Sequence, residues 1–182
     1  MNIVVVNGSP RSIGRTGVLA KQLVDVFNFS FVDLSLGELP LYNGEPEQKE
    51  LEAVKSIRQT LIESDGIVLC TPEYNNAMSG ALKNLVELFG SEPFKQKPIA
   101  LLAVAGGGKG GINALNNART VVRGVYGNAI PKQLVLDPVD FLENEFTVKE
   151  DAFTKVTEVI DELKEYVQKE ILYKEFLESK SF

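Results

Sequence analysis

The chain has 182 residues, a formal net charge of −6, one cysteine and no histidine. Without histidine there is no Ser-His-Asp triad, no Cys-His pair and no imidazole ligand for a metal. A single cysteine forms no internal disulfide, which favours a reducing, cytoplasmic setting. An acidic chain is a poor nucleic-acid binder, and no apolar run is long enough to span a membrane. If the protein is an enzyme, we therefore expect a cofactor to supply the difficult chemistry.

Apolar strand-like runs alternate with amphipathic helical segments along the whole chain. The runs that predict strands lie at residues 2–7, 29–34, 66–71, 99–104 and 133–136. Helical spacing of apolar residues predicts helices at 16–27, 47–63, 78–89 and 112–124, and one from about residue 147 onward. Several of the strands are apolar on both faces, as in a parallel sheet that is covered by helices on both sides. The pattern predicts one α/β domain over residues 1–172, with 173–182 as an extension of the last helix or a loose tail.

Three loops that follow predicted strands have unusual sequences. The first, Ser9–Thr16, places two arginines among small residues directly before a helix, and such a helix start favours a bound phosphate. The second is Thr71–Asn76. The third, Ala105–Gly111, has five glycines in six positions, more than a turn needs, which indicates close approach of a ligand or another backbone. In strand order 2-1-3-4-5 the three loops meet at one edge of a doubly wound sheet, where such sheets bind ligands.

Other chemistries fit this sequence less well. The third loop also reads as G-x-G-x-x-G, but the acidic residue that a dinucleotide fold places about 20 residues later is missing. Lys109 is followed by Gly110 rather than by the serine or threonine of a P-loop. No arginine loop follows Cys70, which we expect in the core rather than as a phosphatase nucleophile. Arg119 and Arg123 share one helix face, where we expect a solvated or interface role.

Several stretches carry a family resemblance. They are N-G-S-P-R-S-I-G-R-T at residues 7–16, L-P-L-Y-N at 39–43, T-P-E-Y-N-N-A-M-S-G-A-L-K-N at 71–84, A-G-G-G-K-G-G at 105–111 and R-T-V-V-R-G-V-Y-G-N-A-I-P at 119–131. On these, over about residues 1–170, the chain resembles the NADPH-dependent FMN reductase family, in particular its azobenzene reductase branch. The resemblance implies a flavodoxin-like, doubly wound sheet of five parallel strands in the order 2-1-3-4-5, with helices on both faces.

The resemblance also implies contacts to FMN from all three loops. The residues implied to hold the phosphate are Ser9, Arg11, Arg15 and Thr16. The residues implied to line the ring and the ribityl chain are Pro72, Glu73, Tyr74 and Asn75. The residues implied to wrap the other end of the ring are Gly106, Gly107, Gly108, Lys109, Gly110 and Gly111.

The implied activity is carried by the flavin, so no side chain is expected to act as a catalytic acid or base. FMN would take hydride from NADPH or NADH and pass electrons to a small-molecule acceptor: an azo compound, a quinone or free flavin. Because both substrates would use one face of the ring, ping-pong kinetics are expected. A flavodoxin-type electron carrier and a non-catalytic FMN-binding protein are the alternatives. The family further implies a homodimer or homotetramer, with helices near residues 78–89 and 114–126 at the interface.

Overall fold

A parallel sheet forms the centre of the computed structural model, which describes residues 1–107, 110–143 and 146–180. Its strands are β1 (Ile3–Asn7), β2 (Ser30–Asp33), β3 (Gly66–Tyr74), β5 (Pro98–Val104) and β6 (Asn128–Leu136). They lie in the order β2-β1-β3-β5-β6, and every neighbouring pair is parallel. The predicted five-stranded, doubly wound sheet of order 2-1-3-4-5 is therefore confirmed.

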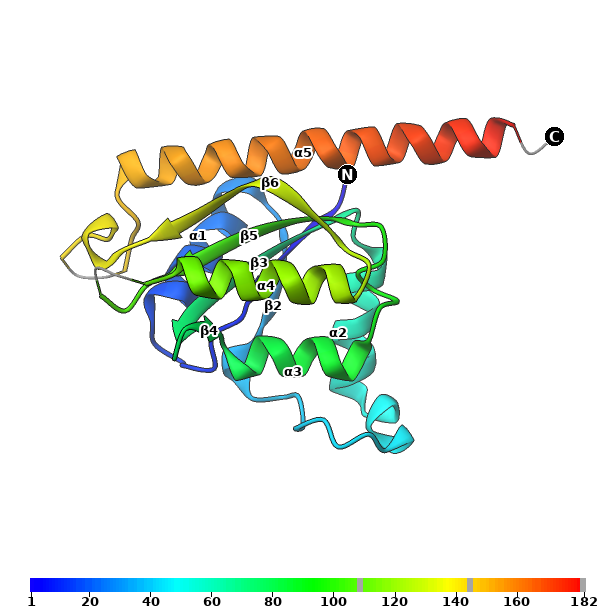
Figure 1. Cartoon of the computed structure of the whole chain (residues 1–182), viewed down its shortest axis with the longest axis horizontal. Coiled ribbons are helices and arrows are strands. Elements are labelled where there is room, and N and C mark those ends of the chain that lie inside the picture. The colour runs from blue at the N-terminus through cyan, green and yellow to red at the C-terminus, as the bar shows by residue number, and fades with distance from the viewer. Residues whose placement is uncertain (108–109, 144–145, 181–182) are drawn as a thin grey trace.

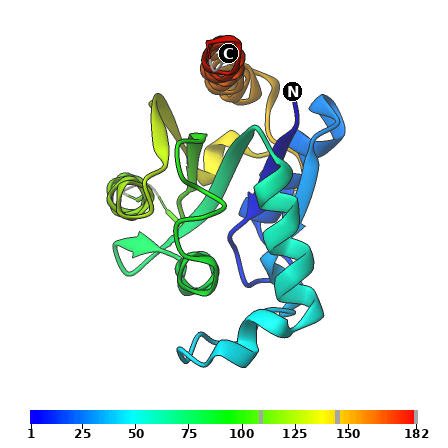
Figure 2. The same ribbon diagram turned by 90° about the vertical axis from the view of Figure 1, so that its right-hand side faces the viewer.

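Helices cover both faces of the sheet (Figures 1 and 2). On one face lie α1 (Arg15–Phe27) and α5 (Glu150–Ser179), and on the other lie α2 (Glu52–Glu63), α3 (Gly80–Phe89) and α4 (Ile112–Gly124). Short 3₁₀ segments are η1 (Leu34–Leu36), η2 (Pro46–Glu50) and η3 (Pro138–Asp140). This two-sided cover explains why the central strands are apolar throughout.

Successive side chains of each central strand enter opposite halves of the core. Val4 and Val6 of β1 pack on the side of α2, α3 and α4, whereas Val5 packs on the side of α1 and α5. In β3, Cys70 lies on the side of α1 and α5 and is fully buried. Burial raises the pKa of the Cys70 thiol, so the residue behaves as a small apolar core residue, as predicted.

The helix predicted over residues 47–63 is wrong in its first third. Residues Pro46–Glu50 form the 3₁₀ segment η2, and Leu51 is extended before α2 begins. Gln48 explains the break, because its buried side chain points back and donates to the carbonyl oxygen of Leu41 at 2.7 Å. A side-chain contact across the preceding loop thus overrides the helical periodicity.

The strand predicted at 66–71 is longer in the structure, and a short strand follows it. β3 continues to Tyr74 and pairs with the antiparallel strand β4 (Ala77–Met78), which was not predicted. The turn between them holds Asn75 and Asn76 at φ of +50° and +64°, a conformation that asparagine tolerates. Consequently α3 begins only after Met78.

The last helix starts at Glu150 rather than near residue 147, and it continues through Ser179. Residues after 172 therefore extend this helix, which projects past the sheet beyond the N-terminus (Figure 1). Over the described residues, neither this helix nor any other combines the length and the apolar character that crossing a membrane requires.

Candidate functional site

The first loop leaves β1 through a contact that only glycine allows. The Gly8 amide donates to the carbonyl oxygen of Cys70 at 2.8 Å, and a Cβ on Gly8 would lie 2.5 Å from that oxygen. Side chains then shape the turn, since the Ser9 amide donates to Asn7 Oδ1 and the Arg11 amide donates to Ser9 Oγ, each at 3.2 Å. The backbone is thus ordered before it reaches α1.

The N-terminus of α1 faces this loop and suits an anion. Its N-cap residue, Gly14, offers no capping side chain, and the first turn contains no acidic residue. No carboxylate there competes with an anionic ligand for the positive end of the helix dipole. Arg11 and Arg15 line one small hollow beside this helix start, and Thr16 is buried in the first turn. The sequence prediction of a phosphate cradle is consistent with this geometry.

The three loops meet at a hollow of about 70 Å³ at the carboxyl edge of the sheet. Its lining residues are Ser9, Arg11, Gly14, Arg15, Thr16, Pro72, Glu73, Tyr74, Val104, Ala105 and Gly106. The hollow is small and enclosed by polar groups at its first-loop side, so it matches a phosphate group rather than a tricyclic ring. A ring bound at the same site would have to extend outward over Tyr74 and Gly106.

Eight of the predicted site residues line this hollow, and the others do not. Asn75, Gly107, Gly110 and Gly111 lie outside its lining, and Gly108 and Lys109 fall outside the described residues. Three further lining residues were not named as site residues: Gly14, Val104 and Ala105. Gly14 and Ala105 lie inside two of the loops that the sequence singled out, and Val104 directly precedes the third loop.

Different structural features explain why glycine occupies the described positions of the third loop. A Cβ on Gly106 or Gly107 would meet nothing within 4 Å, so the space in front of these two residues is open. Gly111 instead has φ +98°, and its Cβ would lie 2.3 Å from Val135 Cγ1. A Cβ on Gly110 would lie 3.3 Å from Glu73 Oε1. Of the described glycines of this loop, Gly106 and Gly107 are therefore left for a ligand, whereas Gly110 and Gly111 satisfy packing.

Arg119 has a structural role within the chain, so it is not the freely solvated residue that was one of the two predicted roles; the predicted interface role stays a prediction. Its guanidinium is half-buried and donates to Gln133 Oε1 at 2.8 and 3.1 Å. It also donates to the carbonyl oxygens of Ala129 and Ile130. Arg119 therefore joins α4 to β6, whereas Arg123 is exposed.

These features are those of a flavodoxin-like α/β fold, and the hollow at the carboxyl edge of its sheet suits a phosphorylated cofactor with a planar ring. FMN fits the residues present: its phosphate suits Arg11, Arg15 and the N-terminus of α1, and its flat ring suits the open space at Gly106 and Gly107. Glycines without side chains let such a ring approach the backbone closely.

Comparison with known proteins gives the family. Residues 1–140 match the sequence model of the NADPH-dependent FMN reductases, and the chain belongs to that family. It is 54% identical over 175 residues to an NADPH azoreductase of Bacillus sp. (strain OY1-2), covering 96% of each chain. It is 29% identical over 157 residues to an FMN-dependent NADPH-azoreductase of Staphylococcus aureus, covering 80% of this chain and 81% of that one. The predicted family, and with it an oxidoreductase that uses FMN and NADPH, is confirmed.

Solved structures agree on the fold. FerB, a flavoenzyme NAD(P)H:(acceptor) oxidoreductase from Paracoccus denitrificans, superimposes with a TM-score of 0.74 at 23% identity. The match covers 92% of this chain and 97% of FerB. An azoreductase from Bacillus anthracis gives a TM-score of 0.55 at 19% identity, covering 92% of this chain and 98% of that chain.

Proposed function

We propose that this reductase passes electrons from NADPH, through FMN, to azo compounds in the cytoplasm, with quinones and free flavin as further acceptors. One observation carries the proposal: residues of all three loops line a single hollow. Arg11 and Arg15 lie on it at the N-terminus of α1, and Tyr74 and Gly106 lie on it from the second and third loops. The azo acceptor is supported by the Bacillus relative, an NADPH azoreductase with which this chain shares more than half of its residues.

The residues of the chain bind and orient rather than react. FMN, when bound, supplies the chemistry by accepting hydride from the reduced nicotinamide and releasing electrons to the acceptor. Arg11 and Arg15 hold the phosphate, and each hydrogen bond to a charged group contributes about 1.5–3 kcal/mol. Ser9 and Thr16 are buried and bring hydroxyl groups to the same place. Water can supply the protons that azo reduction consumes, so the reaction does not require a histidine, which this chain lacks.

Both substrates are expected to use the same open space. The third loop has no side chain at Gly106 or Gly107, and Tyr74 beside it is more than one-third exposed. NADPH and the acceptor would occupy this space in turn, which predicts ping-pong kinetics. Parallel double-reciprocal plots at several acceptor concentrations would support this order, and intersecting plots would contradict it.

The direct test follows the visible spectrum of the FMN-loaded protein without oxygen. NADPH should bleach the flavin bands, and an azo dye added afterwards should restore them. Flavin bands that persist with NADPH and NADH would instead support a flavodoxin-type carrier or a non-catalytic FMN-binding protein. A protein that cannot be loaded with FMN would overturn the site. Arg15→Ala should weaken loading. Arg58→Ala serves as the matched control, because Arg58 is an arginine of α2 that pairs with Glu92 and does not line the hollow.

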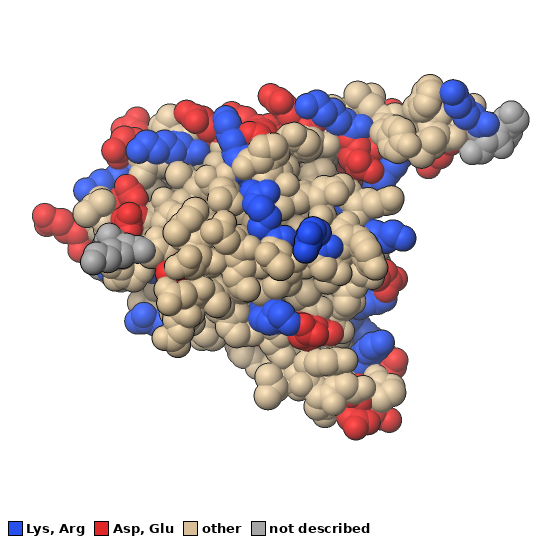
Figure 3. All heavy atoms as spheres, viewed as in Figure 1, with Lys and Arg blue, Asp and Glu red and all other residues tan. Residues whose placement is uncertain are grey.

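We also propose that the protein is a homodimer or homotetramer built on α3 and α4. Figure 3 shows mostly uncharged side chains on the face that carries these helices. Exposed apolar residues stand at both ends of α4, with Ile112 50% and Tyr126 66% exposed. A single copy would leave this surface in water, which disfavours the monomer.

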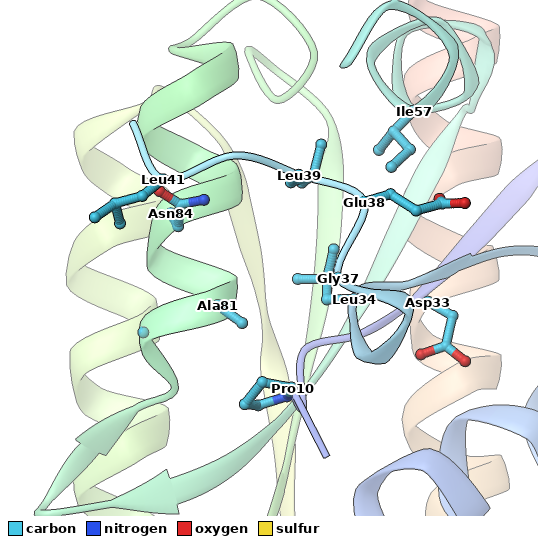
Figure 4. Close-up of a pocket in the computed structure, with 11 residues that line it drawn as sticks. Pro10, Asp33, Leu34, Gly37, Glu38, Leu39, Leu41, Ile57, Ala81 and Asn84 are labelled. Atoms are coloured by element: carbon cyan, nitrogen blue, oxygen red, sulfur yellow. The ribbon is translucent and has the colours of Figure 1, made fainter. Parts of the chain in front are cut away.

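Residues 40–42, which lie beside α3, support the same interface. Asn84 of α3 donates to the Pro40 carbonyl oxygen and accepts from the Tyr42 amide, each at 2.8 Å, which fastens the segment to the helix. Next to it lies an apolar hollow of about 270 Å³, with Ala81 of α3 and Ile57 of α2 on opposite sides (Figure 4). At its rim Leu41 is 81% exposed.

Light scattering on a sizing column tests this assembly. We expect the wild-type protein to be larger than one chain, and Leu41→Glu or Ile112→Glu to shift it towards the monomer. Val26→Glu is the matched control, because Val26 is 57% exposed on α1, on the opposite face of the sheet. A wild-type monomer would refute the proposal.

A further inference from the structure

Helix α4 begins without a cap of its own. In a capping box, the N-cap side chain accepts from the amide three residues on, and the side chain there accepts from the N-cap amide. Here the N-cap residue is Gly111 and the third helical residue is Ala114, so neither side chain can accept. Both amides nevertheless donate to Glu73 Oε2, Gly111 at 2.8 Å and Ala114 at 3.0 Å. One carboxylate oxygen from β3 thus replaces both halves of a capping box.

This contact fixes the end of the glycine-rich loop against the second loop. Glu73 is half-buried and lines the hollow of the candidate site. The start of the third loop is fixed separately, because the Ala105 amide donates to the Leu136 carbonyl oxygen at 2.8 Å. Of the residues between, the described ones are Gly106, Gly107 and Gly110, which carry no side chain, so their positions depend on these two ends.

Two weaker contacts connect the same elements. The Met78 amide of β4 donates to Asn117 Oδ1 at 3.4 Å, and Asn113 Nδ2 donates to Asn76 Oδ1 at 3.3 Å. Both asparagines that reach back lie on α4. The hairpin of β3 and β4 and the beginning of α4 therefore form one connected unit, in which Glu73 makes the shortest bonds.

The partners of the Glu73 carboxylate are backbone amides rather than a cation. Among the ion pairs of the described residues, none involves Glu73. The negative charge instead lies at the positive end of the α4 dipole, where the first turn contains no other acidic residue. The Glu73 side chain must therefore be long enough to reach α4, and it must carry an oxygen that accepts the Gly111 and Ala114 amides.

We propose that Glu73 is a positioning residue that holds the glycine-rich loop in its FMN-binding shape before the cofactor binds. The inference rests on the proposed function, since it assumes that this loop faces FMN. A glycine-rich segment has much conformational freedom to lose, and a loop that is ordered in advance does not spend binding energy on that ordering.

The test compares FMN binding by the apo-protein, measured by quenching of flavin fluorescence. We expect Glu73→Ala to raise the dissociation constant at least tenfold. Glu73→Gln keeps an acceptor oxygen at the same length and should bind within about threefold of the wild type. Glu73→Asp keeps the charge but shortens the side chain, and should behave like the alanine variant. Glu162→Ala is the matched control, because Glu162 also accepts a backbone amide, that of Lys132 at 3.0 Å, away from the hollow.

Hydrogen exchange of the apo-protein gives a second measurement that does not depend on FMN. The amides of Gly111 and Ala114 should exchange slowly in the wild type and in Glu73→Gln, and fast in Glu73→Asp and Glu73→Ala. Wild-type FMN affinity in Glu73→Ala would overturn the proposal, as would Glu73→Gln binding as weakly as Glu73→Ala. A wild-type protein that binds no FMN would instead refute the proposed function, and slow exchange at Gly111 would still support the capping contact.

Discussion

Alanine substitution at two glycines of the third loop should affect two different properties: stability at Gly111 and FMN binding at Gly107. Gly111 has φ +98°, and an added Cβ would lie 2.3 Å from Val135 Cγ1. Strained backbone at a non-glycine residue costs about 1–3 kcal/mol, and an extra methyl group in a packed site costs about as much again. The lower entropy of the unfolded alanine variant offsets about 0.4–1 kcal/mol of this. Gly111→Ala should therefore lower the free energy of unfolding by roughly 1–5 kcal/mol.

Gly107→Ala should leave the free energy of unfolding within about 0.5 kcal/mol of the wild type. Its backbone is not in the left-handed region, and a Cβ there would meet nothing within 4 Å. The methyl group would instead enter the open space in front of the loop and weaken FMN binding. Urea unfolding of the apo-proteins, followed by circular dichroism, measures the first effect, and flavin fluorescence titration measures the second.

The double variant Gly111→Ala with Val135→Ala separates the clash from the backbone strain. Removing both γ-methyl groups of Val135 should restore part of the stability and leave the cost of the positive φ. Wild-type stability in Gly111→Ala would refute the packing argument. Unchanged FMN affinity in Gly107→Ala would refute the placement of the cofactor in front of this loop.

Three further predictions concern other contacts. Arg15→Ala should raise the FMN dissociation constant roughly 10- to 100-fold, the equivalent of one hydrogen bond to a charged group; an unchanged constant would place the phosphate elsewhere. Ser79→Ala should lower the free energy of unfolding by about 1–2 kcal/mol in urea melts, because Ser79 Oγ accepts the Leu82 amide at the start of α3. Burial lowers the pKa of Lys97 to about 8, below the ordinary 10.5. The folded protein then releases this proton before the unfolded chain does, so the stability of the wild type should rise relative to Lys97→Met as the pH rises from about 8 towards 10.5. A stability difference that is flat across this window would contradict the lowered pKa.

The class of fold was predictable because its physical signal is local, whereas the strand order 2-1-3-4-5 came from the family resemblance. Runs such as Val4–Val6 and Ile67–Leu69 are apolar at every position, and only strands that are covered on both faces can bury such runs. Once five such strands alternate with helices, right-handed crossovers leave few arrangements. The helix at 112–124 was predicted with its observed bounds, since its apolar spacing has no competing contact.

The errors occur where a distant contact overrides a local pattern. Residues 47–51 have helical spacing, but Gln48 turns inward to the loop that precedes it. Arg119 reads as a surface arginine, but the carbonyl oxygens exposed by the irregular pairing of β5 with β6 draw it inward. In both cases the partner lies outside the segment whose pattern was used, so neither outcome could be predicted from that segment alone.

The sequence by itself determined the class of fold, the three loops of the candidate site and the family resemblance, because these depend on hydrophobic periodicity and on contiguous motifs. Only the tertiary structure decided what each residue of those motifs does. Glu73 reaches α4, 38 residues further along the chain, and Gly111 packs against Val135. Such roles depend on which elements become neighbours in space, and hydrogen bonds and steric contacts act only over that short range.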